Sequence, residues 1–535
     1  AEASGVWVTA STLVGDGAAG SPSADALFRI RSSIVGSCSA PVETENLPTS
    51  VVIDAGGNVG GCFVEGQAID STVADNGCLS PTPAGCAKTI ALSPGAAAHG
   101  AGDCGEDGDE TISFDQRGFP RSPIGPGCDA GAYEDLGCDQ DPAGFTAADD
   151  RALNLAILCF TLAKEDPAEF IVTLTNDIVL SEPFNDLNEP DFFDPQIGFW
   201  PIDQPRGDAS LTIEGSGHSI SAGASVDALF QTTEQTRGSL AINNVHIVTD
   251  QVFDSFLLLD GIGETTIRNT AVTSSGADKA RFAIDGGPGS LVIENSLIDA
   301  EAVGILSGQG PVTLTTSTVF GNVAVNASSS SELTVTNSTL EGRTAAISAN
   351  GNVSGLVQST TVNGPGIFGN FADPSNFQVV SSYFTGECPA AVVLGPGNAG
   401  QCFDGINDAV WLPVVDNGCV VPTPVGCVPT VALTTGSPAL GAGSCTGIAT
   451  DQRGEPRTPV GVGCDAGAFE LAGFVGFELG DVDADGTVDN ADVQALLAYL
   501  AGGDDPAGLS VADVNDDGEI RLDDALLLAQ QIADG

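Results

Sequence analysis

The sequence predicts an all-β protein: right-handed parallel β-helix solenoids in tandem, followed by a small all-α calcium-binding module at the C-terminus. Short alternating apolar segments recur about every 22 residues through the centre of the chain, which is typical of a solenoid. A pattern of six cysteines occurs twice, before and after this repeating region. Two acidic, glycine-containing loops stand near the C-terminus. These observations divide the chain into three regions.

Each region has an expected architecture. Residues 1–135 should hold the terminal coils and closing loops of a first β-helix. Residues 136–472 should form a second β-helix, with a helix over its first coil and closing loops of its own. Residues 473–535 should form the calcium-binding module.

The repeating segments predict the coils of the second β-helix. The central apolar residue of each short strand marks one coil: Ile213, Ile242, Ile267, Ile293, Leu314, Val335, Val357 and Val379. Two residues after most of these anchors stands a small polar residue: Asn244, Asn269, Asn295, Thr316, Asn337, Ser359 or Ser381. Asparagine tolerates a left-handed backbone, and its amide can stack on the next copy. We therefore expect these positions to form a turn ladder.

The N-terminal segment is related to the end of the repeating region. Residues 28–35 align with residues 377–384, and Val8 precedes Ile30 by another coil length. We expect residues 1–40 to be the last coils of a β-helix whose earlier coils are missing, with unpaired strand edges at the start. A second β-helix should begin near Cys138. There, residues 152–158 predict an amphipathic helix, which would cover the first coil.

The fourteen cysteines predict disulfide bonds. Matched cysteines in even number are typical of disulfides in an exported chain, rather than of metal thiolates. Other connectivities stay open from sequence alone. The local pairs we expect are Cys38–Cys62, Cys78–Cys86, Cys104–Cys128 and Cys138–Cys159, with Cys388–Cys402, Cys419–Cys427 and Cys445–Cys464 as the repeats.

The segments between the cysteines are duplicated as well. Asp-Gln-Arg-Gly occurs at residues 115–118 and again at 451–454, and each copy precedes a Cys-Asp-Ala-Gly-Ala segment. Arginine and carboxylate groups are suited to paired hydrogen bonds, so we expect these residues to fix the closing loops rather than to act in catalysis. They are Asp115, Arg117, Asp129 and Glu134 in the first copy, and Asp451, Arg453, Asp465 and Glu470 in the second.

These duplicated blocks resemble the bacterial and archaeal surface β-helix proteins described as choice-of-anchor Q. The resemblance covers most of residues 1–472, and residues 138–159 resemble a cysteine-containing segment often found upstream in such proteins. It implies an exported, surface-associated protein. It implies no established reaction.

The composition fits an extracellular protein, either attached to the cell surface or secreted. There are 16 basic and 71 acidic residues, and the formal charge of −55 repels nucleic acid and anionic lipid. No segment approaches the ~20 apolar residues of a membrane helix, so no membrane insertion is expected. The charge of −55 also excludes nucleic-acid binding.

Two twelve-residue loops near the C-terminus carry the most specific chemistry in the sequence. Calcium prefers six to eight oxygen ligands, which such loops supply from alternate positions around a glycine at position 6. Gly486 and Gly518 occupy that position. We expect two calcium ions, held by Asp481, Asp483, Asp485, Thr487, Asp489 and Asp492 in the first loop and by Asp513, Asn515, Asp517, Glu519 and Asp524 in the second. Arg521 at position 9 should make the second site looser.

Each calcium loop runs into an apolar helical stretch, and position 12 is aspartate where an EF-hand has glutamate. This duplicated loop-helix pattern resembles a type I dockerin. The resemblance implies docking to a cohesin domain. Loop positions 10 and 11, which are often Ser-Thr in dockerins and contact the cohesin, are residues 490–491 and 522–523 here, and their different identity leaves the cohesin unspecified.

Two classes of function follow. The favoured class is a non-enzymatic structural or adhesive surface protein. It would bind a cohesin-like domain, another copy of itself or a polysaccharide surface. An open first coil and a docking module at the other end would give head-to-tail contacts, and hence a homopolymer or filament. The alternative is a dockerin-tethered polysaccharide lyase or glycoside hydrolase of β-helix fold.

No catalytic residue is assigned. A glycosidase needs two carboxylates flanking the scissile bond, and the sequence shows no recognisable arrangement of that kind. Asp149 and Asp150 lie beside the expected cap helix. The three histidines, His99, His218 and His246, share no evident spacing and are interpreted as loop or surface residues.

Overall fold

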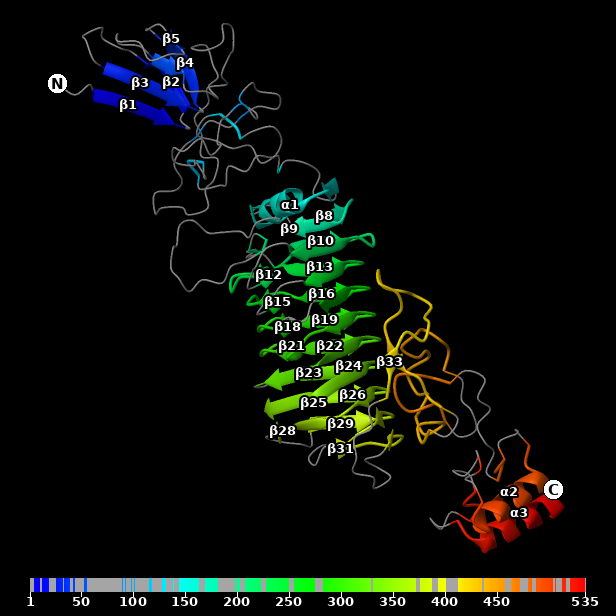
Figure 1. The fold of residues 1–535 in the computed structure, drawn as a ribbon. Coiled ribbons are helices and arrows are strands. Elements are labelled where there is room, and N and C mark those ends of the chain that lie inside the picture. The colour runs from blue at the N-terminus through cyan, green and yellow to red at the C-terminus, as the bar shows by residue number, and fades with distance from the viewer. Residues whose placement is uncertain are drawn as a thin grey trace. The chain divides into compact units, whose positions relative to one another are not determined.

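The chain divides into two compact units, Ala1–Gln140 and Asp141–Gly535. The computed structural model describes residues 4–54, 89–138, 144–471 and 480–534, each range with gaps (Figure 1). Long parallel sheets dominate these residues, and two helices form the C-terminal module. The predicted fold class is therefore confirmed. The division at residues 135 and 472 stays a prediction.

The first unit contains parallel strands one coil apart. Its strands are β1 (Ser4–Thr9), β2 (Thr12–Ala18), β3 (Ala26–Arg31), β4 (Ile34–Cys38), β5 (Val42–Glu43) and β6 (Val52–Asp54). One sheet has the order β1-β3-β6-β5, and β2 pairs with β4. Val8 pairs with Ile30, as the coil spacing predicts. Leu13 pairs with Val35 in the neighbouring sheet.

The second unit is a parallel β-helix with one long wall of 11 described strands. These strands pair in chain order, each with the equivalent strand of the next coil. They are β7 (Phe145–Ala147), β8 (Glu169–Leu174), β10 (Ser210–Glu214), β13 (Ser239–Asn243), β16 (Thr265–Arg268), β19 (Leu291–Glu294), β22 (Val312–Thr315), β24 (Glu332–Thr336), β26 (Ser354–Gln358), β29 (Phe377–Val380) and β31 (Val393–Leu394).

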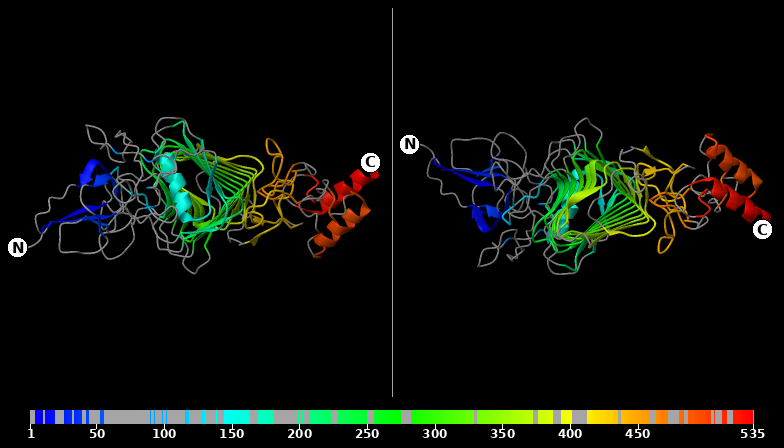
Figure 2. Two further views of the ribbon diagram at one scale, coloured as in Figure 1. Left: turned by 90° about the horizontal axis from the view of Figure 1, so that it is seen from above. Right: turned by 90° about the horizontal axis from the view of Figure 1, so that it is seen from below.

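Two further rows of strands belong to a second sheet and merge in the long strands β23 (Thr318–Ser328) and β25 (Thr339–Gly351). One row comprises β9 (Ile178–Leu180), β11 (Ser219–Ala222), β14 (His246–Thr249), β17 (Ala271–Ser274), β20 (Leu297–Asp299), β27 (Thr361–Asn363), β30 (Tyr383–Phe384) and β32 (Ala399–Gly400). The other comprises β12 (Ala228–Thr232), β15 (Ser255–Leu259), β18 (Phe282–Asp285), β21 (Val303–Ser307) and β28 (Ile367–Phe371). Figure 2 shows the coils stacked around a common interior.

The predicted anchors form one continuous register. Ile213 pairs with Ile242, and the pairing continues through every predicted anchor to Val379. All eight anchor side chains are 0% exposed. Because side chains alternate between the two faces of a strand, this register places a single apolar column inside the coil. The predicted coil assignment is confirmed residue by residue.

The turn ladder is confirmed as well. Each of its seven predicted residues has a positive φ, between 44 and 56°. The Asn295 amide donates to the Asn269 Oδ1 at 2.8 Å, so neighbouring turns are joined as expected. The ladder also includes Ser216 (φ 53°), which the spacing missed because Gly215 adds one residue to that turn.

A helix covers the first coil of the second unit, as predicted. This helix, α1 (Asp150–Leu162), contacts β7, β8 and β9 and lies across the end of the coil stack (Figure 2). Asp149 caps its N-terminus by accepting from the Ala152 backbone at 2.9 Å. Phe160 is fully buried and makes an edge-to-face contact with Phe170. The helix thus shields apolar interior that an uncovered first coil would expose.

Residues 412–471 form a segment that we call the closing strap. It contains β33 (Val414–Val415) and β34 (Thr430–Val431), which pair antiparallel. Two predicted disulfides are confirmed here, Cys419–Cys427 and Cys445–Cys464. Cys128, Cys138 and Cys159 are also disulfide-bonded, and no described cysteine is free. The pairing of Cys138 with Cys159 stays a prediction, and each of the other predicted pairs involves a cysteine side chain outside the described residues.

The C-terminal module contains α2 (Asn490–Leu500) and α3 (Leu522–Asp534), which pack against each other. Val482, Leu496, Val514, Ala525 and Leu528 form its buried core. The two calcium-loop segments and the two helices therefore pack around one shared core. None of the helices among the described residues is long and apolar enough to cross a membrane.

Candidate metal centre

Three carboxylates converge in the first C-terminal loop. One oxygen from each of Asp481, Asp483 and Asp492 lies within 4.8 Å of the others. Asp481 and Asp492 are 0% exposed. Carboxylates that are buried and this close repel one another unless a cation balances them. Oxygen-only ligands of this kind suit a hard cation such as calcium.

The position-12 aspartate closes the first loop through both of its carboxylate oxygens. Asp492 Oδ1 accepts from the Asp483 backbone at 2.9 Å, and Oδ2 accepts from the Asp489 backbone at 2.7 Å. These bonds tie loop positions 3 and 9 to the first turn of α2. The loop is therefore folded around the same carboxylate that is expected to hold the ion.

The second loop repeats this arrangement. Asp524, which is 0% exposed, accepts from the Asn515 backbone at 3.2 Å and from the Arg521 backbone at 2.8 Å. These donors occupy loop positions 3 and 9, as Asp483 and Asp489 do in the first loop. The position-12 aspartate therefore has the same structural role in both copies, and the duplication extends to individual hydrogen bonds.

Asp489 has a second role that the loop spacing did not indicate. Its side chain accepts from the Ala491 backbone at 2.7 Å, and it forms a capping box with Asp492 at the start of α2. A carboxylate at a helix N-terminus also interacts favourably with the helix dipole. Position 9 thus links the loop to the helix.

The predicted ligands are only partly covered by the described residues. Thr487, Asp489, Asp513 and Asn515 are among them. Asp485, Asp517 and Glu519 lie outside them. The complete ligand set and the number of ions therefore stay predictions.

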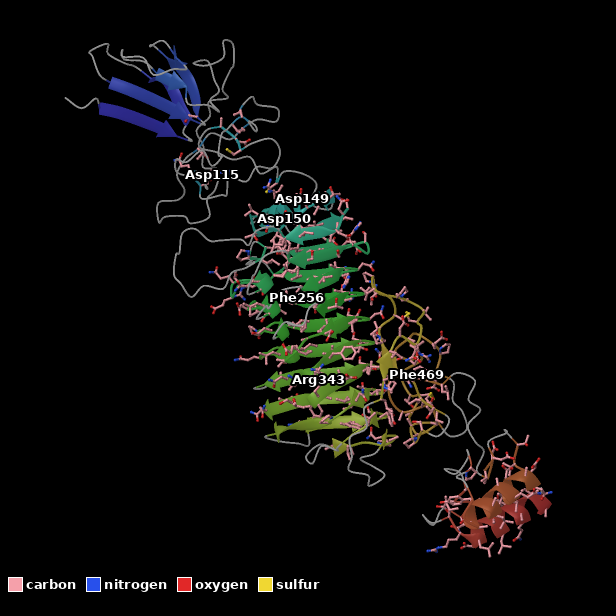
Figure 3. The ribbon with its side chains drawn as sticks, in the orientation of Figure 1. Asp115, Asp149, Asp150, Phe256, Arg343 and Phe469 are labelled. Atoms are coloured by element: carbon pink, nitrogen blue, oxygen red, sulfur yellow. A yellow bond between two sulfur atoms is a disulfide. The ribbon has the colours of Figure 1, made fainter. Side chains whose placement is uncertain are left out.

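The closing strap contains a different cluster of buried charges, and it confirms the expected Arg-carboxylate pairing. Arg453 Nη2 lies 2.6 Å from Asp451 Oδ2, and its guanidinium stacks 3.6 Å above the centre of the Phe469 ring. Asp451 also accepts from the Glu470 backbone at 3.0 Å. The first copy has the same turn, because the Arg117 backbone and Nε both donate to Asp115. Figure 3 labels Asp115 and Phe469.

Arg457 links the strap to the turn ladder. Its side chain is 1% exposed, pairs with Glu470 at 3.2 Å and donates to Asn337 Oδ1 at 2.8 Å. Burial, and then the nearby Asp465 carboxylate, raises the pKa of Glu470 to about 7. Burial also raises the pKa of Asp465. Sequence reasoning assigned Glu470 to the loop-fixing cluster but passed over Arg457.

Other bonds join the strap to the coils along the same row. Asn295 donates to the Val421 carbonyl, and the Gln452 amide lies between the Thr318 and Thr339 hydroxyls. Farther along, the Ala468 backbone donates to the Thr361 hydroxyl at 3.0 Å. The ladder and the duplicated block were separate patterns in the sequence. In the structure they form one interface.

Two carboxylate pairs bear on the enzymatic alternative. Burial, and then the Asp260 charge, raises the pKa of Asp285. Burial also raises the pKa of Glu341; the Asn363 amide and the Arg343 charge oppose this effect, and the Asp299 charge adds to it least. Glu341 accepts from the Asn363 amide at 2.8 Å. Carboxyl groups with raised pKa values are suited to proton donation, so Asp285 and Glu341 are the acids to test.

Comparison with known proteins bears on the C-terminal module. Residues 479–533 match the family model described as Dockerin type I domain. Neither the curated proteins nor the solved structures contain a match to the chain. Type I dockerins bind calcium and dock to cohesin domains, so the match supports both properties for this module. The C-terminal region of the chain is a type I dockerin domain.

Proposed function

We propose that this protein is an extracellular structural or adhesive protein whose β-helix is held in place by calcium-dependent docking of its C-terminal module to a cohesin domain. The convergence of Asp481, Asp483 and Asp492 in the dockerin region carries the proposal. The charge of −55 fits a calcium-rich exterior, where many cations are available. The resemblance to choice-of-anchor Q surface proteins agrees with this location.

The helices of the module offer a surface for docking. Leu522 and Leu526 on α3 are 58% and 64% exposed, and Leu497 on α2 is 41% exposed. Exposed apolar side chains on a small module are typical of a protein interface. Leu522 also occupies loop position 10, one of the two positions that contact cohesins in the dockerins that this module resembles.

Calorimetric titration of the full chain with a panel of type I cohesin domains tests the proposal. We expect binding in millimolar calcium and none after chelation. Asp492→Ala should weaken binding strongly, and Leu522→Asp with Leu526→Asp should abolish it while leaving calcium binding intact. Val179→Asp, at an exposed residue on the β-helix, is the matched control. If no cohesin binds in calcium, the docking partner is a different one.

Self-assembly is the finer form of this proposal. The strand β1 forms the edge of its described sheet, and an edge strand can pair with another chain. We expect light scattering to show larger particles in calcium than after chelation. A strictly monomeric protein in millimolar calcium would contradict assembly but would leave cohesin docking untouched. Binding to a polysaccharide surface, without cleavage, belongs to the same adhesive role.

The second candidate function is cleavage of an acidic polysaccharide, and the raised pKa values of Asp285 and Glu341 favour it. Turnover would appear as unsaturated products or as new reducing ends. Glu341→Gln and Asp285→Asn separate the two acids. Activity that one of these substitutions abolishes would replace the structural proposal with the enzymatic one.

A further inference from the structure

The sequence contains three acceptor motifs for N-linked glycosylation, in which serine or threonine stands two residues after an asparagine. Their asparagines are Asn326, Asn337 and Asn352. The motif alone treats the three sites alike, and a match to it carries a risk of false positives. The structure separates them, because the three asparagines lie at different places on the coil of the β-helix.

Asn337 is committed to the contact between the turn ladder and the closing strap. It is 3% exposed, and both ends of its side-chain amide are bonded. The nitrogen donates to the Thr450 carbonyl at 3.0 Å, and Oδ1 accepts from Arg457 at 2.8 Å. A glycan on that nitrogen would replace the bond to Thr450 and separate the strap from the coil. Asn337 is therefore unsuited to carry one.

Asn326 lies within a sheet. It belongs to β23, and it pairs with Leu306 on one side and with Ser348 on the other. The whole motif, residues 326–328, is part of this strand. Neighbouring strands lie about 4.8 Å apart, so a bulky glycan here would crowd the coils on both sides. Asn326 is also half-buried, which makes it a poor acceptor.

Asn352 lies at a corner of the coil, between β25 and β26. It is exposed, and its side-chain amide makes no hydrogen bond to another described residue. Gly351 before it has a φ of 96°, a backbone conformation that glycine adopts readily, and Val353 after it is 2% exposed. The bend thus places Val353 in the interior and leaves the Asn352 amide in solvent.

The same corner faces outward on other coils. Counting back from the paired strand residues, Asn352 corresponds to one residue on each earlier coil of the long wall. Those that the structure describes are all exposed: Arg237, Ile262, Pro288 and Gln309. Because side chains of such different chemistry share this exposure, it arises from the geometry of the coil. A group attached at Asn352 therefore extends into solvent.

The corner is also distant from the closing strap. Asn352 precedes β26, whereas Ser359 of the turn ladder follows it. A strand rises about 3.3 Å per residue, so these two residues lie about 20 Å apart. The strap is bonded at the ladder end of the wall strands, for example at Asn337 and Ser381. A glycan on Asn352 would leave these contacts intact.

We propose that Asn352 is an N-glycosylation site, which accepts an oligosaccharide from a polyprenyl-phosphate-linked donor. In the transfer Asn352 Nδ2 forms a bond to the anomeric carbon of the first sugar, and the bond from that carbon to the phosphate oxygen breaks. The oxygen keeps the electron pair, and the amide releases a proton. Ser354 supplies the hydroxyl of the acceptor motif. This inference rests on the extracellular location proposed above, because such glycans are typical of secreted proteins.

Peptide mass spectrometry of the full chain, isolated from the cells that produce it, tests this site. The peptide that contains Asn352 should carry a sugar mass, which fragmentation assigns to that residue. The peptides that contain Asn326 and Asn337 should have their unmodified masses. Unmodified Asn352 in protein recovered from the cell exterior would overturn the site and leave the extracellular location standing. Sugar found only on Asn326 or Asn337 would also overturn it.

Substitutions in the producing cells sharpen this test. Asn352→Gln and Ser354→Ala should each remove the sugar mass completely, whereas Ser354→Thr should retain it because the motif accepts either hydroxyl. Asn326→Gln is the matched control and should keep the glycan of the parent chain. Calcium-dependent cohesin docking is expected to be unchanged in all four variants. A sugar mass that persists in the Asn352→Gln variant would contradict the assignment.

Discussion

The closing strap and the C-terminal module both bury carboxylates, and they balance this negative charge in different ways. In the strap, Asp451 and Glu470 are buried beside Arg453 and Arg457, and the arginines supply the positive charge. In the first calcium loop, Asp481 and Asp492 are buried just as deeply. The module has one basic residue, Arg521, and it belongs to the other loop.

The difference shows where each part of the protein obtains its stability. A cluster balanced by arginine is complete within the chain, and its stability is set by geometry and hydrogen bonds. A cluster of carboxylates without such a partner depends on an ion from outside, because binding free energy then contributes to folding. The β-helix and its strap should therefore be indifferent to calcium, and the module should not.

The largest expected effect is that of calcium removal. Chelation should unfold residues 473–535, since the buried carboxylates then repel one another. The helical circular dichroism of α2 and α3 should fall, and their amides should lose protection from hydrogen exchange. The coils and the strap should keep their protection. Unchanged hydrogen exchange in α2 and α3 after chelation would contradict the calcium dependence of the module.

A smaller but substantial effect is expected from Arg457→Ala. The substitution leaves Glu470 buried without its partner and removes the bond to Asn337, which should cost about 3–5 kcal/mol. Hydrogen exchange of the strap measures this loss directly. Arg268→Ala is the matched control, because the Arg268–Glu294 pair is about half exposed and should contribute at most about 1 kcal/mol. Equal losses in both variants would contradict the role given to Arg457.

The smallest expected effect is a dependence of strap stability on pH. The pKa of Glu470 is about 7 in the folded protein, above its ordinary value of 4.5. The folded strap therefore holds a proton that the unfolded chain releases, and this contribution is complete below pH 4.5 and lost as the pH rises through 7. Strap protection, corrected for intrinsic exchange rates, should fall across this window. Glu470→Gln should flatten the dependence; a parent profile that is already flat would exclude the mechanism.

The coil geometry could be predicted from the sequence because it is set by short-range rules. An apolar column inside a coil requires one anchor per turn, and the residue after each strand must adopt a left-handed backbone. Both requirements leave local traces, so Ile213 through Val379 and Asn244 through Ser381 were assigned correctly. The calcium loops were found for the same reason, since their ligands lie within twelve consecutive residues.

The contacts between distant segments could not be predicted in this way. Arg457 and Asn337 are far apart in sequence, and nothing in either segment identifies the other as its partner. A backbone hydrogen bond joins His246 to the His218 carbonyl across two neighbouring coils, and the average spacing does not place these two residues together. The environment of Glu341 likewise depends on Asn363, which pairs with Glu341 from the next coil and donates to its carboxylate. These contacts form only once the coils have stacked.

The attachment of the strap has a mechanical consequence. The chain leaves the β-helix through the strap before it reaches the docking module, so tension on a docked module acts first on the strap. The strap is bonded to several successive coils, at Asn295, Thr318, Asn337, Thr361 and Ser381. Force on the strap is therefore divided among these coils. A tether joined directly to the last coil would instead place the whole load on that coil.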